Sequence, residues 1–478
     1  MIFESEKELL PILRVLREAG RRLNVPLYIV GGAVRDKILF NKLVRDIDVV
    51  CVGNGIELAK QVQALLPEKP RLAVYRRFGT AMLNTSGFQL EFVGARKESY
   101  SPNSRKPAVE SGTLEDDQRR RDFTINAMAV SLSEESYGKL LDPFNGMEHL
   151  KQKLIKTPLD PHQTFSDDPL RMLRAIRFAA TLHFRIDPDT FRAIHDNRQR
   201  IEIVSQERIA GEIQRIMMAD KPSEGWILMF KSGLLELVFP ELYAMHGVEV
   251  KGKTAHKDNF YHTMQVLDNV AAKTDNVWLR WAALLHDIGK PLTKRWSEDT
   301  GWTFHGHDAV GANMVRRIFK RFRFPLGQQM EYVRKLVRLH QRPMNLTGDE
   351  ITDSAIRRII FESGEDLDDL LLLCECDMTT KSEEKRKRYL DNYRVFREKV
   401  AEVEARDHLR NWKPPVTGED IMAFFGIPPG RVVGVIKEHI KESILEGVIP
   451  NEREAALEEM KRKGLELGLT PQAPNLKG

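Results

Sequence analysis

Cysteine is scarce in this sequence. Cys51, Cys374 and Cys376 are the only three among 478 residues, and the last two lie in an apolar, helix-like run. So few cysteines do not predict a disulfide framework or a zinc finger. Long apolar runs are also missing: none has the length of a membrane-spanning helix, and the first residues, MIFESEKELL, lack the apolar core of a signal peptide. We therefore expect a cytoplasmic enzyme without a membrane partner.

Neither sign of charge dominates. The chain has 74 Lys and Arg against 69 Asp and Glu, which gives a net charge of +5 and a pI near 8.9. This balance permits nucleic-acid binding by a local basic stripe but does not by itself indicate it. With 42% hydrophobic residues, a chain of this length can bury more than one core, and we expect about three or four domains.

The apolar pattern changes near residue 140. Residues 1–25 have the spacing of an amphipathic helix, and short apolar runs then alternate with turn signals up to residue 135. After Asp142-Pro143, helical periodicity dominates. The expected fold class is α+β, a mixed α/β head followed by all-helical parts. We place a head at 1–135, a neck at 136–245, a helical body at 246–400 and a helical tail at 401–478.

The most informative motif is GGAVRDKILFNKLVRDID, from Gly31 to Asp48. A strand-like run leads into Gly31 and Gly32, where backbone without Cβ can approach a phosphate closely and donate N–H groups to it. Arg35 follows on the next turn. Asp46 and Asp48 alternate with an isoleucine, so on a strand both carboxylates point to one face and can share a divalent cation. Either half alone would be an ordinary Gly-Gly turn or a salt-bridged strand edge, but the pair indicates Mg²⁺-assisted phosphoryl or nucleotidyl transfer.

Three further segments of the first half carry polar groups. Glu91 lies in an alternating strand, FQLEFV, where it could help to hold a metal or form a strand ion pair. Residues 94–118 are polar and rich in Pro, Ser and charge, which is typical of a long mobile loop. In the following RRRDFTINAM, Arg121, Asp122 and Asn126 offer groups that match ribose hydroxyls and a triphosphate. Asp122 could equally cap a helix that starts at the next residue.

An arginine stripe follows Pro169. Asp168 is suited to cap the helix that Pro169 begins. Arg171, Arg174 and Arg177 recur every third residue beside an apolar stripe, where they need anionic or acceptor partners. Cytosine and adenine present an amine donor next to a ring-nitrogen acceptor, and an Asp acceptor beside an Arg donor matches both. Guanine and uracil would leave these charged groups unpaired.

These motifs resemble those of the DNA polymerase beta-like nucleotidyltransferase superfamily, specifically its class II branch of CCA-adding enzymes and bacterial poly(A) polymerases. The resemblance implies three catalytic carboxylates, Asp46, Asp48 and Glu91. It implies a nucleotide-binding set of Gly31, Gly32, Arg35, Arg121, Asp122 and Asn126. Asp168 and Arg171 match the amino-acid template for the incoming base, and Arg174 and Arg177 match further nucleotide contacts. Asp167 departs from the Glu of many members.

The family pattern also covers the segments between these motifs. A flexible loop like 94–118 is what the change from C to A addition depends on in CCA-adding enzymes, and the matching residues here are Arg96, Glu98, Tyr100 and Arg105. DPFNG at 142–146 resembles the link between head and neck, or forms an ordinary Asp-Pro turn. SQERIAGE at 205–212 completes the neck signature, and we expect its Glu207 and Arg208 to brace the template helix by ion pairing.

The second half carries a separate set of His and Asp residues. HDIGK at 286–290 resembles the HD phosphohydrolase domain, in which a metal collects nitrogen and oxygen ligands from several helices. The resemblance implies a first metal site, here for a transition metal, made of His262, His286, Asp287 and Asp377. His307 and His340 could extend it to two metals, while His305 is not expected to be a ligand. A vestigial site without activity is the alternative.

Basic and aromatic residues alternate from 381 to 413, with Tyr389, Tyr393, Phe396 and Trp412 among them. This pattern fits binding of an RNA backbone with exposed bases, and it fits a solvated helix face equally well. GEDIM at 418–422 and PPGRVVG at 428–434 resemble the tail of a tRNA-acceptor-binding region.

Together these features predict a CCA-adding tRNA nucleotidyltransferase with an HD domain, which uses CTP, ATP and Mg²⁺ without a nucleic-acid template. Poly(A) polymerases of this branch carry a Gly-Arg-Arg-Phe-Arg-Leu-type string, whereas this chain has VYRRFGTA at 74–81, which favours CCA addition. Poly(A) or A-only addition is one alternative. The other is an RNA-binding HD phosphohydrolase with an inactive transferase, which the intact Asp46 and Asp48 disfavour.

Overall fold

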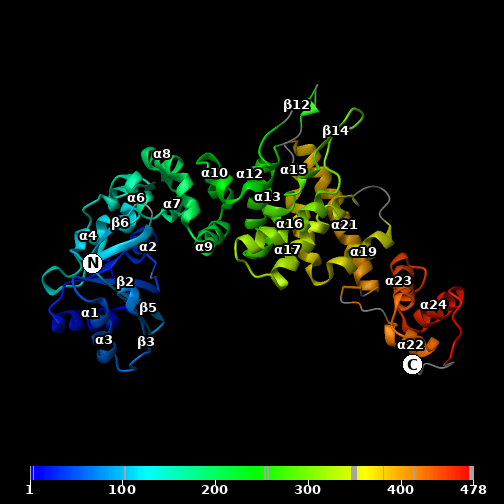
Figure 1. Cartoon of the computed structure of the whole chain (residues 1–478), viewed down its shortest axis with the longest axis horizontal. Coiled ribbons are helices and arrows are strands. Elements are labelled where there is room, and N and C mark those ends of the chain that lie inside the picture. The colour runs from blue at the N-terminus through cyan, green and yellow to red at the C-terminus, as the bar shows by residue number, and fades with distance from the viewer. Residues whose placement is uncertain are drawn as a thin grey trace. The chain divides into compact units, whose positions relative to one another are not determined.

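The computed structural model describes the chain except for residues 1, 4, 43, 102–103, 249, 252–253, 256–257, 346–351, 380–381, 408, 411, 413–414 and 473–478. It divides into two compact units, Met1–Tyr243 and Ala244–Gly478 (Figure 1). None of the helices in the described ranges combines the length and apolarity needed to cross a membrane. The mixed α/β first part and the helical remainder confirm the predicted α+β class.

A mixed seven-stranded sheet organises the first unit, in the order β3-β4-β5-β2-β1-β8-β9. β2 and β5 are parallel, and the other neighbouring pairs are antiparallel. The strands are β1 (Leu27–Val30), β2 (Asp46–Cys51), β3 (Leu72–Tyr75), β4 (Thr80–Thr85), β5 (Phe88–Gly94), β8 (Ala129–Ser131) and β9 (Leu140–Leu141). The apolar run before Gly31 and the alternating segment at Asp46 therefore form adjacent strands, as predicted.

The two faces of this sheet differ in character. Along β2, Ile47 between the carboxylates and Val49 after them are buried. The helices α1 (Leu10–Leu23) and α3 (Gly55–Leu65) pack against each other and against the sheet. The alternate residues lie on the other face. There Val50 joins a small core cluster with Ala95 and Leu114, while the carboxylates nearer the start of β2 and β5 stay accessible.

The polar stretch at 94–118 is ordered where the structure describes it, so the prediction of a long loop was wrong. β6 (Arg96–Ser101) and β7 (Ser104–Ser111) pair from Arg96↔Ser111 to Ser101↔Ser104. α4 (Leu114–Arg119) follows, with a capping box at Thr113. Backbone pairing does not require apolar side chains, and for this reason the composition gave no strand signal.

Helices follow the sheet in the first unit. The short η2 (Thr124–Asn126) and η3 (Glu134–Ser136) lead to α5 (Gly146–Lys151), whose first N–H groups at Gly146 and Met147 donate to the Asp142 carboxylate at 2.6 and 2.8 Å. α7 (Leu170–Leu182) packs on α9 (Gln206–Met217) and α10 (Pro222–Lys231). The remaining elements are α6 (Pro161–Asp167), α8 (Pro188–Asn197), η4 (Arg198–Ile203), α11 (Leu234–Val238), α12 (Pro240–Tyr243) and the paired β10 (Leu154–Ile155) and β11 (Arg185–Ile186).

The described residues of the second unit are helical apart from two short hairpins and the connecting segments. Its helices are α13 (Asn259–Ala271), α14 (Val277–Leu285), α15 (Lys290–Thr293), α16 (His307–Arg321), α17 (Gln328–Leu339), α18 (Arg342–Asn345), α19 (Asp353–Ser363), η5 (Gly364–Asp366), α20 (Leu367–Asp377), α21 (Glu383–Asp407), α22 (Gly418–Phe425), α23 (Arg431–Glu446) and α24 (Arg453–Glu466). The hairpins pair β12 (Val250–Lys251) with β13 (Thr254–Ala255) and β14 (Arg295–Ser297) with β15 (Gly301–Thr303).

Two of the aromatic residues for which the sequence left RNA binding and a solvated helix face open are instead core residues. Tyr393 and Phe396 on α21 are buried, and the Tyr393 hydroxyl donates to the Leu371 carbonyl on α20 at 2.5 Å. Tyr389, one turn earlier, is exposed. The alternation of basic and aromatic residues on this helix therefore arises largely from its amphipathic packing. Cys374 and Cys376 are free, buried thiols of α20.

Candidate active site and metal centre

The three candidate catalytic carboxylates lie on neighbouring strands of the first unit. Asp46 and Asp48 project from the start of β2, and the parallel register pairs Asp48 with Glu91 on β5. Burial raises the pKa of the Asp48 carboxyl, which Arg121 opposes only in part. Burial and the Asp48 charge also raise the pKa of Glu91. Carboxylates that share one face repel one another when ionised, and a bound divalent cation relieves this repulsion. Such a group is therefore a suitable set of ligands for a divalent cation.

Gly31 lies between Asp48 and Arg121, where a residue with a side chain would be strained and crowded. Its φ is +75°, in the region that L-residues seldom adopt, and its N–H donates to the Met128 carbonyl at 3.3 Å. A Cβ at this position would come within 3.2 Å of Asp48 Oδ2 and 3.1 Å of Arg121 Nη1. α2 (Gly32–Phe40) begins at the next residue, so unpaired N–H groups of its first turn lie beside the carboxylates.

A polar network runs from α2 to α7. Arg35 is buried, and its Nη1 donates to Asn126 Oδ1 at 2.7 Å. Asn126 Nδ2 donates to Asp122 Oδ1 at 3.0 Å, and Arg174 lies 2.6 Å from Asp122 Oδ2. Burial acts to raise the pKa of Asp122, but Arg174 and Asn126 outweigh it and lower that pKa to about 2. The backbone N–H of Phe123 also donates to Asp122 Oδ1 at 2.8 Å, but η2 begins at Thr124 with Phe123 at its N-cap and no side-chain capping bond, so the capping alternative for Asp122 is not found.

Three residues that the sequence analysis did not identify form ion pairs or ring contacts with the arginines of this region. Glu212 on α9 is 2% exposed and accepts from Arg177 Nε at 2.5 Å, with Arg174 at 3.8 Å. The Phe178 ring lies under both guanidinium groups and under that of Arg35, at 3.7 to 5.5 Å from its centroid. Asp117, which is fully buried, pairs with Arg120 and Arg121. Glu212 could have been found as an acid on the apolar stripe of α9.

The proposed template residues stand at the junction of α6 and α7. Asp168 Oδ1 accepts from the Leu170 N–H at 3.2 Å, the capping contact that the sequence predicts, and Asp168 Oδ2 lies 2.7 Å from Arg208 Nη2. The ion pairing predicted for Arg208 is thus confirmed. Arg171 donates to the carbonyls of Arg120 at 2.6 Å and Thr164 at 3.4 Å. Its guanidinium is therefore oriented by backbone rather than by a carboxylate.

The second unit gathers the predicted HD residues around Asp287. Side-chain ligand atoms converge within 4.8 Å in two described groups, His262-His286-Asp287 and Asp287-His307-His340. Asp377 Oδ1 adds a second carboxylate, 2.9 Å from His262 Nε2 and 3.5 Å from His286 Nε2. His305 is exposed and outside both groups.

All four imidazoles of this centre are oriented in the same way. Each turns Nε2 inward, while Nδ1 contacts an oxygen at 2.7 to 2.8 Å: Thr379 Oγ1 for His262 and the carbonyls of Ala283, Phe304 and Val337 for His286, His307 and His340. Such outer contacts fix a metal-binding tautomer. Nε2 of His286 and of His307 is buried and lies 3.2 Å from a carboxylate oxygen of Asp287 without forming a well-aligned hydrogen bond. Buried polar atoms in this state fit a bound cation, so the residues present suit a metal.

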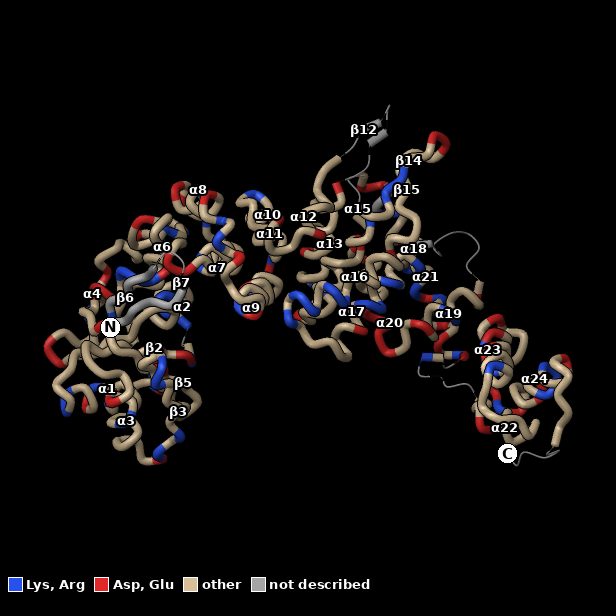
Figure 2. Tube along the Cα trace, in the orientation of Figure 1, with Lys and Arg blue, Asp and Glu red and all other residues tan. Residues whose placement is uncertain are grey.

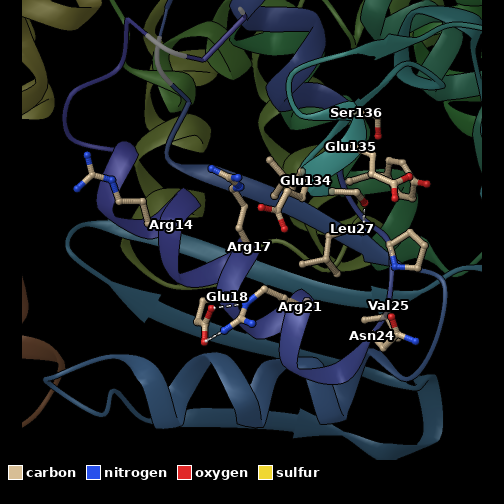
Figure 3. A pocket seen from close by; sticks show the side chains of 15 residues that line it. Arg14, Arg17, Glu18, Arg21, Asn24, Val25, Leu27, Glu134, Glu135 and Ser136 are labelled. Carbon is tan, nitrogen blue, oxygen red and sulfur yellow. Dashed lines mark hydrogen bonds and ion pairs between the residues drawn. The ribbon is translucent and has the colours of Figure 1, made fainter.

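A cavity of about 690 Å³ lies at the other end of β1 from Gly31. α1 and the segment Leu132–Ser136 line it, with Arg14, Arg17 and Arg21 on one side and Glu134 and Glu135 on the other (Figure 3). None of the candidate site residues lines this cavity, so it is separate from the carboxylate face.

Comparison with known proteins identifies the family. The Poly A polymerase head domain matches residues 27–156, the probable RNA and SrmB- binding site of polymerase A matches 183–245, and the HD domain matches 259–375. An A-adding tRNA nucleotidyltransferase of Deinococcus radiodurans is 32% identical over 354 residues, covering 72% of this chain and 78% of that protein. The chain belongs to the tRNA nucleotidyltransferase family. This confirms the resemblance that the motifs predicted.

Other members of the tRNA nucleotidyltransferase family extend the match. A multifunctional CCA protein of Shewanella frigidimarina is 30% identical over 364 residues, covering 74% of this chain and 83% of that protein. The structure of the Bacillus stearothermophilus CCA-adding enzyme in complex with CTP has a TM-score of 0.67 at 21% identity, covering 97% and 99% of the two chains, and so shares the fold. The protein is accordingly a nucleotidyltransferase, and enzymes of this family use divalent metal ions.

Proposed function

We propose that this tRNA nucleotidyltransferase adds C, C and A to the 3′ end of tRNA from CTP and ATP. The supporting observation is the polar network from α2 through Asn126 and Asp122 to Arg174 on α7. It ties α2, the helix next to the carboxylates, to α7, which begins just after Asp168 and carries Arg171. One incoming nucleotide can then place its triphosphate at the carboxylates and its base at the start of α7. A cytoplasmic location, where tRNA and both triphosphates occur, is part of the proposal.

The ions at the carboxylates are proposed to be two Mg²⁺; when bound, one would activate the RNA 3′-hydroxyl and the other would steady the triphosphate as pyrophosphate leaves. Asp46 and Asp48 would hold them, with Glu91 beside. The first N–H groups of α2, from Gly32 onward, would contact phosphate oxygens, with Gly31 allowing the close approach, and Arg121, next to Asp48, would bind phosphate or ribose. Arg35, Asp122 and Asn126 would complete the nucleotide site from the network side.

Base choice is assigned to the start of α7. Asp168 would accept the exocyclic amine of cytosine or adenine, and Arg171 would donate to the adjacent ring nitrogen. The Arg208 ion pair positions the Asp168 carboxylate, and the two carbonyls that Arg171 contacts hold its guanidinium. Arg174 and Arg177 would make the further nucleotide contacts. The carbonyl of uracil or guanine would face the Asp168 carboxylate, which disfavours both bases.

A-only addition is the competing activity, since one relative of comparable similarity is named A-adding. The deciding experiment supplies tRNAs that lack CCA, CA or A and gives CTP and ATP separately and together, followed by sequencing of the 3′ ends. CCA addition predicts that CTP alone extends tRNA lacking CCA by two residues. Extension only of tRNA ending in CC, and only by one A, would establish the A-adding activity. Long A tails would establish a poly(A) polymerase.

A second candidate function, phosphoester hydrolysis, is favoured by the convergence around Asp287. His262, His286, Asp287 and Asp377 would hold a transition metal, and His307 and His340 a second one. The metal would supply an activated water for a small phosphate ester or cyclic phosphate. Hydrolysis assays with Mn²⁺, Co²⁺ and Ni²⁺ test this. We propose four domains for this chain. They are a catalytic head at 1–135, a neck at 136–245, an HD body at 246–400 and a tail at 401–478.

A further inference from the structure

A turn next to the carboxylate face exposes two aromatic rings. β3 ends at Tyr75, η1 (Arg76–Phe78) follows, and Gly79 in the left-handed region leads into β4. Tyr75 is 46% exposed and Phe78 is 64% exposed. Large apolar side chains in adjacent, solvent-facing positions are unfavourable for folding and often mark a binding surface.

Among the described residues, the basic side chains of this turn have no acidic partners. Arg71 precedes the exposed part of β3, Arg76 and Arg77 lie in η1, and all three are exposed. Figure 2 colours the Lys and Arg positions along the chain blue. Within the described chain no ion pair involves any of them, whereas exposed arginines elsewhere, such as Arg21 and Arg119, pair with glutamates of their own helices. Free guanidinium groups beside exposed rings suit phosphates that alternate with bases.

Strand register places this turn on the catalytic face. Directly paired residues share a face of the sheet. Asp48 pairs with Glu91, Glu91 with Met82, and Thr80, two residues from Met82, with Tyr75. At about 4.8 Å per strand and about 6.8 Å per same-face step, Tyr75 lies about 16 Å from Asp48, the length of roughly two or three nucleotides. The Arg96 guanidinium of β6 also donates to the Phe78 carbonyl at 3.2 Å, which fixes the turn.

We propose that Tyr75, Arg76, Arg77 and Phe78 form a platform that binds the unpaired 3′ end of the RNA primer. The rings would stack on the bases one or two positions behind the reacting 3′-hydroxyl, and the arginines would bind the phosphates between them. This inference rests on the proposed transfer to RNA and extends it by assigning a primer site distinct from the nucleotide site. The platform is sequence-tolerant, because every base offers a stacking face.

The test uses the full-length protein and an RNA hairpin with an unpaired 3′ tail that carries 2-aminopurine at the second or third base from its end. Binding is followed by fluorescence without metal or nucleotide. The variants are Tyr75→Ala with Phe78→Ala, and Arg76→Gln with Arg77→Gln. Matched controls are Phe40→Ala, an exposed ring on α2, and Arg14→Gln, an exposed arginine on α1.

Wild type and controls are expected to quench the fluorophore equally. The aromatic pair should lose this quenching and bind RNA about 5-fold to 100-fold more weakly. The variant with Arg76→Gln and Arg77→Gln should reduce the slope of log K against log salt by about 1.4, because each lost phosphate contact on a single strand lowers this slope by about 0.7. Unchanged quenching and affinity in both variants would refute binding of the RNA 3′ end by the platform. The exposed surface would then be assigned to contact with a protein partner. Wild type that binds and quenches but never extends RNA would instead refute the proposed function alone.

Discussion

Asp46 and Asp48 offer the most direct test of the transferase site. Asp46→Asn or Asp48→Asn keeps the size of each side chain but removes its charge, so metal binding and therefore nucleotide addition should be abolished. Affinity for tRNA should survive, because distributed Lys and Arg contacts supply it. Incorporation of labelled CTP and ATP measures the first effect, and filter binding of tRNA the second. Addition at near wild-type rate by either variant would mean that the metal lies elsewhere.

Asp168 combines two roles that a mutation can separate. Loss of its contact with the Leu170 N–H should cost about 1 kcal/mol of stability and leave base choice unchanged. Loss of a base-edge acceptor should reduce discrimination against U and G by about 1–3 kcal/mol. We expect Asp168→Ala and Arg171→Ala to fold, to add C and A slowly and to admit U or G in competition assays. A destabilised variant with strict selection would show that Asp168 only caps α7.

The Asp122 carboxylate predicts a pH-dependent contribution to stability. Its pKa is lowered from 3.8 to about 2 in the folded protein, so its stabilisation is fully present above pH 4 and is lost as the pH falls through 2. A shift of this size corresponds to about 2 kcal/mol. Thermal melting should find Asp122→Asn less stable than wild type at pH 5, with the difference shrinking by pH 2.5. A constant difference across this range would contradict the assignment.

A single buried acid, Glu212, supplies the ion pairs between α7 and α9 in the described residues. Glu212→Gln leaves Arg174 and Arg177 short of negative charge in a buried setting, and removal of one partner from such a cluster costs about 3–5 kcal/mol. We expect a lower melting temperature for the first unit and slower nucleotide addition, because the network that reaches Asp122 starts here. Glu202→Gln, an exposed acid of η4, is the control. Equal melting of both variants would show that Glu212 is dispensable.

Elements with a strong local sequence pattern could be predicted. Elements that depend on pairing with another strand or on tertiary contacts could not. The Gly31-Gly32 turn and the alternation at Asp46 specify β1, α2 and β2 because each depends on nearest neighbours along the chain. The β6–β7 hairpin was missed because its stabilising partners are backbone groups of another strand. Phe178 looked like an ordinary core residue, and only the fold shows three guanidinium groups against its ring.

The HD residues were found from the HDIGK string and its distant partners, and their convergence could not be derived from spacing alone. They come from α13, α16, the end of α14, the residue after α17, and α20. Only helix packing brings them within reach of Asp287. The transferase carboxylates and this centre lie in different compact units, Met1–Tyr243 and Ala244–Gly478. Each unit has its own buried core, so each centre is expected to form without residues from the other.

Metal content provides the test of this separation. We expect Asp287→Asn to lose the transition metal, because Asp287 is the one residue common to both ligand groups, and with it all phosphoester hydrolysis. Nucleotide addition should continue, since no transferase residue is altered. His305→Ala, which changes an exposed histidine outside the centre, should retain the metal. Elemental analysis after loading with Mn²⁺, Co²⁺ or Ni²⁺ measures binding, and release of phosphate or opening of a cyclic phosphate measures hydrolysis. Metal retained in Asp287→Asn would refute the ligand set, while wild type that binds metal without hydrolysing any ester would establish a structural centre.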